Sequence, residues 1–139
     1  MKIICTQENL YKGLLKVQGV ATSATSLPIL KNILLDAKGG SLTLRATDLE
    51  MGIITEVRGK IEKEGQTTLD AQIITNFVAL LPQDQVTISQ DAKSVTIKGG
   101  THKTKLNTLA AEEYPVIPEV ERTQGFKVNV NDFKKALSQ

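Results

Sequence analysis

Asp48 and Glu50 are two carboxylates that stand two residues apart and could be imagined as a catalytic pair. Two neighbouring carboxylates can act as general acid and general base. Because no histidine or candidate nucleophile stands in the same motif, we interpret Asp48 as a turn residue that binds its own backbone. Glu50 is then a neighbour that faces solvent. The motif gives no support to an enzyme such as a small hydrolase.

The sequence offers few other reactive groups, since it has one cysteine, Cys5, and one histidine, His102. Cys5 stands in a short apolar segment and is expected to be buried rather than reactive. His102 follows a Gly-Gly turn and is expected in a solvated loop. A disulfide within the chain is impossible, and a metal site would need other ligands. We therefore predict no catalytic residue, no metal and no cofactor.

Size and charge set further limits on function. The chain has 139 residues, of which 40% are hydrophobic and 23% charged, and its formal net charge is +2. These values are typical of a globular domain with an ordinary core. The charge is too small for a domain that grips nucleic acid by phosphate neutralisation alone. No segment resembles a signal peptide or a membrane span, so we expect a cytoplasmic protein without a membrane partner.

The elements that must carry these side chains are clearest in the middle of the chain. An apolar run at residues 33–35 is followed by strict alternation at residues 41–47. Alternation of apolar and polar residues is typical of a strand with one buried and one solvent-facing side. Gly39 and Gly40 stand between the runs and supply the positive φ angles of a hairpin turn. A third alternating run at residues 51–57 completes an antiparallel meander.

A strand and a helix precede this meander. Residues 3–6 are predicted to form a short strand, and Thr6 is the expected helix cap. Leu10, Leu14 and Val17 recur at i, i+4 and i+7, which indicates an amphipathic helix ending near Gly19. The order of this first unit is therefore strand, helix and three strands.

The same order then occurs a second time. A strand at residues 65–69 is followed by a helix that Asp70 caps and Pro82 ends. Three more strands are expected at residues 85–89, 94–98 and 103–108. The sequence thus predicts an α+β fold with an internal βαβββ repeat of about 60 residues, visible in the pattern and not in residue identity.

Residues 110–124 resemble a connector, since they carry two prolines and several charges. A strand at residues 126–130 and a helix capped by Asn131 are expected to follow. We interpret them as the opening of a third copy, cut off at Gln139. The expected domains are therefore residues 1–124, with the connector, and residues 125–139 as the truncated beginning of a second domain.

Four stretches carry a resemblance to a known family: SLPILKNILL (26–35), LTLRATDLEMG (42–52), LPQDQVTI (81–88) and LNTLAAEEYPVIPE (106–119). In this order and spacing they resemble the β subunit of bacterial DNA polymerase III, the sliding clamp. The resemblance implies the DNA-clamp fold, in which antiparallel sheets back two helices. It also implies a processivity factor: a head-to-tail homodimer that encircles duplex DNA and tethers the replicative polymerase. Polymerase and clamp loader would bind through domains that this sequence does not contain.

The resemblance places the helices inside the ring, which makes Lys12, Lys16, Gln72 and Asn76 the candidate DNA-facing residues. The alternative without a role on DNA is that Lys12 and Lys16 lie on a solvated helix face, where Glu8 pairs with Lys12. On the second helix the expected exposed residues, none of them cationic, are Gln72, Thr75, Asn76 and Ala79. Clamps often carry an arginine near the position of Gln72 and another where Ala24 stands here. These departures predict weak DNA contact by this domain.

The last strand carries the candidate subunit interface: Lys103, Thr104, Lys105 and Leu106. Lysines also protect an ordinary edge strand from unwanted pairing, so they are expected under either interpretation. The resemblance favours an interface with the third domain of the other subunit. The alternative for the whole chain is a stand-alone adapter domain for protein interactions, without a role on DNA.

Overall fold

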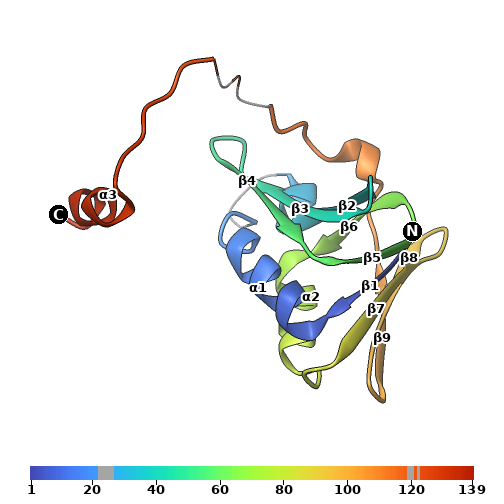
Figure 1. Cartoon of the computed structure of the whole chain (residues 1–139). Coiled ribbons are helices and arrows are strands. Elements are labelled where there is room, and N and C mark those ends of the chain that lie inside the picture. Colours follow the sequence, from blue (N-terminus) through green and yellow to red (C-terminus); the bar gives the residue numbers. More distant parts are fainter. Residues whose placement is uncertain (22–26, 119–120, 122) are drawn as a thin grey trace.

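The computed structural model describes residues 1–21, 27–118, 121 and 123–139. Its elements fall into two antiparallel sheets, two helices packed on them and one further helix near the C-terminus (Figure 1). In chain order they are β1 (Lys2–Thr6), α1 (Gln7–Val17), η1 (Pro28–Lys31), β2 (Asn32–Lys38), β3 (Ser41–Thr47), β4 (Gly52–Val57), β5 (Gly59–Lys63), β6 (Gly65–Asp70), α2 (Ala71–Ala79), β7 (Gln85–Gln90), β8 (Ser94–Gly99), β9 (His102–Asn107), η2 (Ala111–Glu113) and α3 (Val130–Leu137).

The strand pairing confirms the duplicated architecture. One sheet has the order β5-β1-β7-β8-β9, and the other has the order β4-β3-β2-β6. The first strand of each repeat therefore pairs with the three-stranded meander of the other repeat. This reciprocal exchange gives the domain an approximate two-fold arrangement and joins the halves into one folding unit.

The turn between β2 and β3 has the predicted geometry. Gly39 and Gly40 have φ angles of 61° and 82°, and Lys38 pairs with Ser41 across the turn. A two-residue turn with both φ angles positive matches the right-handed twist of the strands that it joins. This hairpin holds β2 and β3 at the centre of the four-stranded sheet.

Strand β5 was not predicted from the sequence. Only Ile61 in it is apolar, so the segment lacks the alternation that marks a strand. It forms because β1 offers an open edge, and Lys2 and Glu62 make an ion pair of 2.8 Å across the two strands. The second repeat has no equivalent strand in the described residues. Beside β6, the first strand of the second repeat, the carbonyl of Leu109 accepts a hydrogen bond from the hydroxyl of Thr68.

The core lies between the helices and the inner faces of both sheets. As predicted, Leu10, Leu14 and Val17 of α1 are fully buried. The largest fully buried side chains are all aliphatic, in keeping with the low aromatic content: Ile3, Leu10, Leu14, Leu30, Ile33, Leu35, Leu42, Leu44, Leu69, Ile74, Ile88 and Ile97. Burial of this apolar surface is the main force that holds α1 and α2 side by side on the sheets (Figure 1).

Helix α1 lies unusually close to β4 because residue 13 is a glycine. A Cβ atom added at Gly13 would lie 2.5 Å from Cγ2 of Val57 and 3.2 Å from Cδ1 of Leu44. Any side chain larger than hydrogen would therefore push the helix away from the sheet. The same approach brings the residues that follow Val57 next to the exposed side of α1.

A second, smaller cluster lies on the other side of the four-stranded sheet. Its buried residues are Ile29, Leu30, Leu34 and Tyr114. The hydroxyl of Tyr114 accepts a hydrogen bond from the backbone N–H of Thr47 and donates one to the carbonyl of Asn32. Tyr114 thus fastens the segment that follows β9 onto β2 and β3.

The C-terminal region differs from the sequence prediction. Residues 126–130 form no strand, and the N-cap of α3 is Asn129 rather than Asn131. All described residues from 123 onward are exposed, and residues 126–130 pair with neither sheet, so the alternating segment has no partner strand. No helix in the described part of the chain is long and apolar enough to cross a membrane.

Candidate nucleic-acid interface

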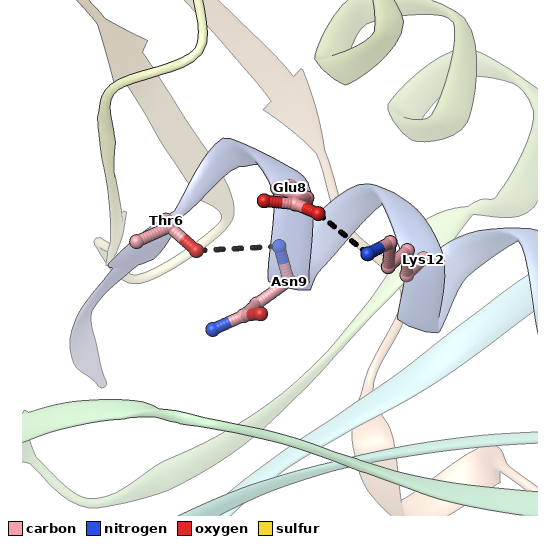
Figure 2. A network of polar contacts seen from close by, with 4 residues as sticks. All are labelled: Thr6, Glu8, Asn9 and Lys12. Atoms are coloured by element: carbon pink, nitrogen blue, oxygen red, sulfur yellow. Dashed lines mark hydrogen bonds and ion pairs between the residues drawn. The ribbon is translucent and has the colours of Figure 1, made fainter.

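The N-terminal half of α1 presents a small polar network to solvent (Figure 2). The hydroxyl of Thr6 accepts a hydrogen bond of 3.3 Å from the backbone N–H of Asn9, which is the predicted cap. Glu8 stands in the first turn, where a carboxylate is favoured by the helix dipole. This network fixes the start of the helix and therefore the direction of the side chains on its exposed face.

Lys12 does not stand alone on this face. Its ammonium group donates a hydrogen bond to Oε1 of Glu8 at 2.5 Å, one turn earlier (Figure 2). This hydrogen bond and the charge of Lys12 hold the pKa of Glu8 below its usual value. Both side chains are about two-thirds exposed, 66% and 65%, so water and salt compete with the pair. Lys12 is available to an anion that can displace Glu8.

Lys16 lies one turn further along α1 and is exposed. It makes no ion pair within the residues that the structure describes. Its position in the last turn of the helix suits a cation, because the C-terminal end of the helix carries partial negative charge. The predicted exposure of Lys12 and Lys16 on one helix face is therefore confirmed, whereas DNA contact stays a prediction.

Arg58 is a third cation beside this face, and the sequence analysis did not single it out. It directly follows β4 and is exposed. A hollow of about 210 Å³ borders both α1 and the end of β4, and its lining residues are Asn9, Lys12, Gly13, Lys16, Glu56, Val57 and Arg58. Arg58 belongs to no local motif, so only the packing of α1 on β4 reveals its place.

Helix α2 presents a neutral exposed face next to α1. Gln72, Asn76 and Ala79 are exposed as predicted. Thr75 was expected in solvent but is buried, and its hydroxyl donates a hydrogen bond to the carbonyl of Ala71. This bond satisfies the hydroxyl within the helix, which makes its burial tolerable.

Two apolar residues of the α2 region face solvent. Ile73 is 51% exposed and Leu80 is 79% exposed. The helix ends at Ala79, so Leu80 lies beyond the face that packs on the sheets. The part of the helix surface next to Gln72 and Asn76 is therefore partly apolar as well as uncharged.

Strand β9 forms one edge of the five-stranded sheet, which confirms the predicted edge position. Lys103 and Lys105 are exposed, whereas Thr104 and Leu106 are partly buried. Leu106 packs against the core of its own domain and is only partly buried, so its contact with a second subunit stays a prediction. Lys103 lies directly opposite Lys98 of β8, and neither lysine forms an ion pair within the described residues.

The turn that holds Asp48 and Glu50 is structural, as expected. The carboxylate of Asp48 accepts hydrogen bonds from the backbone N–H groups of Glu50 and Met51, at 3.0 and 2.7 Å. Leu49 has a φ angle of 78°, which is uncommon for a bulky residue. The Asp48 bonds and one from Leu49 N–H to the hydroxyl of Thr47 hold this conformation. Oδ1 of Asp48 thus serves the turn.

Of the remaining candidates for reactive chemistry, only Cys5 was predicted correctly in full. Cys5 is buried, and burial raises the pKa of its thiol to about 11. His102 is exposed as expected, but it is the first residue of β9 and not a loop residue, because it pairs with Gly99 of β8. No group of three histidine, cysteine, aspartate or glutamate side chains could hold a metal ion within residues 1–21, 27–118, 121 and 123–139. Ala24 lies outside the described residues.

Taken together, the two sheets, the reciprocal repeat and the adjacent helices define an α+β domain of the sliding-clamp class. Solved clamps have the same fold: the DNA polymerase III β subunit of Pseudomonas aeruginosa matches with a TM-score of 0.92 at 28% identity, over 99% of this chain and 38% of that one. The β subunit of Caulobacter crescentus matches with a TM-score of 0.81 at 37% identity, over 85% of this chain and 32% of that one.

The sequence comparison identifies the family. The N-terminal domain of the DNA polymerase III β subunit matches residues 1–118, and the chain belongs to this family. The β sliding clamp of Synechococcus elongatus is 31% identical over 140 residues, which are 99% of this chain and 37% of that protein. The β sliding clamp of Caulobacter vibrioides is 32% identical over 142 residues, which cover 100% of this chain and 38% of that protein. The chain thus spans little more than a third of the length of these relatives.

Proposed function

We propose that this chain is the first domain of a processivity factor, a non-catalytic ring subunit that encircles duplex DNA and tethers a replicative polymerase in the cytoplasm. The observation that carries the proposal is the exposed face of α1 and α2, two adjacent helices of a sliding-clamp domain. Lys12 and Lys16 supply cations on α1, and Gln72 and Asn76 supply neutral polar groups on α2. Such a face can meet phosphates without holding them tightly.

The small charge supports a topological hold on DNA rather than a tight one. A formal net charge of +2 cannot neutralise many phosphates, and α2 offers no cation. Tight phosphate contacts would also slow movement along the duplex, because each contact must break before the ring can advance. A closed ring of such domains would retain DNA by enclosure and would leave it free to slide.

The same proposal assigns two further features. Residues 1–124 form the first clamp domain with its connector, and residues 125–139 begin the second, which fits the complete exposure of the described residues from 123 onward. The edge strand β9, with Lys103, Thr104, Lys105 and Leu106, is the side that joins a second subunit head to tail. An open edge can continue a sheet across a subunit boundary.

A titration of the chain with a fluorescent duplex tests the DNA contact. We expect weak, sequence-independent binding, with a Kd of roughly 10⁻⁴–10⁻⁶ M at physiological salt. Lys12→Glu combined with Lys16→Glu should weaken it and flatten its salt dependence. The matched control is Lys93→Glu combined with Lys98→Glu, which removes two exposed cations elsewhere. Nanomolar affinity of the wild type, or an equal loss of affinity in the two double variants, would contradict the proposal.

The alternative is a stand-alone adapter domain that binds proteins through its open edges. Four edge strands, β5, β9, β4 and β6, are compatible with such a role. An adapter would show no DNA binding at low salt and no effect of the Lys12 and Lys16 changes. The exposed lysines on α1 favour the clamp, since an adapter needs no cations on its helix face.

A further inference from the structure

We propose that Arg58 completes a phosphate-binding hollow with Lys12 and Lys16, and that Glu8 and Glu56 compete with the phosphate for these cations. The inference rests on the proposed DNA-binding function and names the residues that set its strength. The ligand is the anionic backbone of the duplex. The site lies between α1 and the end of β4.

The packing of α1 on β4 brings the three cations to one place. Gly13 lets Val57 approach the helix so closely that no Cβ would fit between them. Arg58 is the next residue after Val57 and lines the same hollow as Lys12 and Lys16. The convergence is therefore a consequence of the fold and not of sequence proximity.

The chemistry of the hollow suits a phosphodiester. The guanidinium group of Arg58 can donate two parallel hydrogen bonds to phosphate oxygens, and the lysines add point charges. Arg58 forms no ion pair within the described residues, so no carboxylate has to be displaced from it. Asn9 lines the same hollow and adds a neutral amide.

Two carboxylates oppose this attraction. Glu8 already holds the ammonium group of Lys12, and Glu56 lines the hollow itself. A phosphate must replace Glu8 at Lys12 and must approach Glu56 against charge repulsion. The three cations thus keep only a small excess of positive charge, which weakens each contact and favours sliding over holding.

Arg58 also borders a second hollow, of about 500 Å³, on the side of β1 and β5. The other cation there is Lys60, which lies 3.8 Å from Glu62 and is two residues from Arg58. Lys60 does not line the hollow beside α1. Lys60→Gln is therefore the matched control for Arg58→Gln, with the same loss of charge at nearly the same place in the chain.

The test is fluorescence anisotropy of the chain with a labelled 20-base-pair duplex at several salt concentrations. We expect Arg58→Gln to weaken binding roughly fivefold and to reduce the slope of log K against log salt by about 0.9, the value of one phosphate contact. Lys60→Gln should change affinity less than twofold. Glu8→Gln should strengthen binding, and this gain should vanish when Lys12→Gln is also present.

The outcomes separate this inference from the proposed function. One outcome would refute the Arg58 site and leave the proposed function intact. In it, the wild type binds and Lys12→Gln and Lys16→Gln weaken this binding, but Arg58→Gln and Lys60→Gln change the affinity equally. If Glu8→Gln still strengthened DNA binding in the presence of Lys12→Gln, Glu8 would not compete with the phosphate for Lys12. No binding by the wild type at low salt would overturn the DNA contact, and the hollow with it. Thermal unfolding of each exposed-site variant checks that the fold is unchanged.

Discussion

At the scale of single residues, Tyr114 connects the end of the domain to its centre. Its hydroxyl is both acceptor and donor, to Thr47 N–H at 3.2 Å and to the carbonyl of Asn32 at 3.1 Å. Both backbone groups belong to strands, and the ring is buried with only 6% exposed. Burial also raises the pKa of the phenol, so the hydroxyl stays protonated and able to donate.

Removal of this hydroxyl should destabilise the domain. Tyr114→Phe leaves a buried N–H without its partner, which costs about 1–3 kcal/mol. Urea denaturation followed by circular dichroism measures the change. The control is Tyr11→Phe, whose hydroxyl makes no hydrogen bond within the described residues and should change stability little. Equal effects of the two substitutions would show that the Tyr114 hydroxyl does not fasten the connector.

Cys5 should make stability depend on pH in the alkaline range. The pKa of a free thiol is about 8.5, and burial raises that of Cys5 to about 11. Because the folded state favours the neutral thiol, this contribution is fully present below pH 8.5 and is lost as pH rises towards 11. We expect the stability difference between wild type and Cys5→Ala to shrink over this window. A constant difference from pH 8 to pH 11 would show that the thiol is not desolvated.

Some residue roles could be predicted from the sequence and others could not. The pairing of Lys12 with Glu8 and the turn role of Asp48 depend on local spacing, which the sequence displays directly. The burial of Thr75 depends on which side of α2 meets the sheets, and the hydroxyl is satisfied by a bond to its own helix. The place of Arg58 depends on the contact of α1 with β4, between residues far apart in the chain. Tertiary packing decides such cases, and a single sequence does not show it.

At the scale of elements, Gly13 fixes how closely α1 lies on the four-stranded sheet. Alanine there would improve helix propensity by about 1 kcal/mol. Its Cβ would also lie 2.5 Å from Cγ2 of Val57, a stiff β-branched side chain. Overpacking of a core contact costs typically about 1–3 kcal/mol, so the two effects oppose each other and the clash is the larger.

We therefore expect Gly13→Ala to destabilise the domain by up to about 2 kcal/mol, the difference between these effects. The control is Gly19→Ala, because a Cβ at Gly19 would meet no atom within 4 Å. Thermal unfolding should show a lower Tm for Gly13→Ala only. Because Arg58 follows Val57, the same substitution should also weaken DNA binding. A stabilised Gly13→Ala variant would mean that α1 can move away from β4 at no cost.

Strands that lack an alternating pattern of their own, and that form only because a neighbouring strand pairs with them, cannot be predicted from the sequence. The alternation of β3 and the helical spacing of α1 are intrinsic patterns, and both elements were predicted. Strand β5 has no such pattern and exists because the edge of β1 receives it. Residues 126–130 have the pattern but pair with neither sheet, and they form no strand. Alternation indicates a strand only where a partner is available.

At the scale of the whole molecule, the exposed edges decide what the domain can join. Like charges directly opposite in a sheet are unfavourable, and Lys98 and Lys103 are such a pair. The isolated chain gains nothing from this arrangement. It becomes favourable when a partner strand with carboxylates lies along β9, because both lysines then meet opposite charge.

The last prediction uses this conflict between stability and assembly. Lys103→Glu places a carboxylate opposite Lys98, so it should stabilise the isolated chain by about 0.2–1 kcal/mol. Lys105→Glu, which faces Thr96, should give no comparable gain. In a full-length clamp subunit that carries this domain, the double substitution should shift the dimer towards monomer in analytical ultracentrifugation at low micromolar concentration, because attraction across the boundary becomes repulsion. Leu106 is unsuitable for this test, since it packs against its own core and its substitution would disturb the fold. The contrary result is a dimer that persists after the double substitution, although Lys103→Glu stabilises the isolated chain. It would show that β9 is not the interface and that Lys98 and Lys103 protect an ordinary edge strand from unwanted pairing.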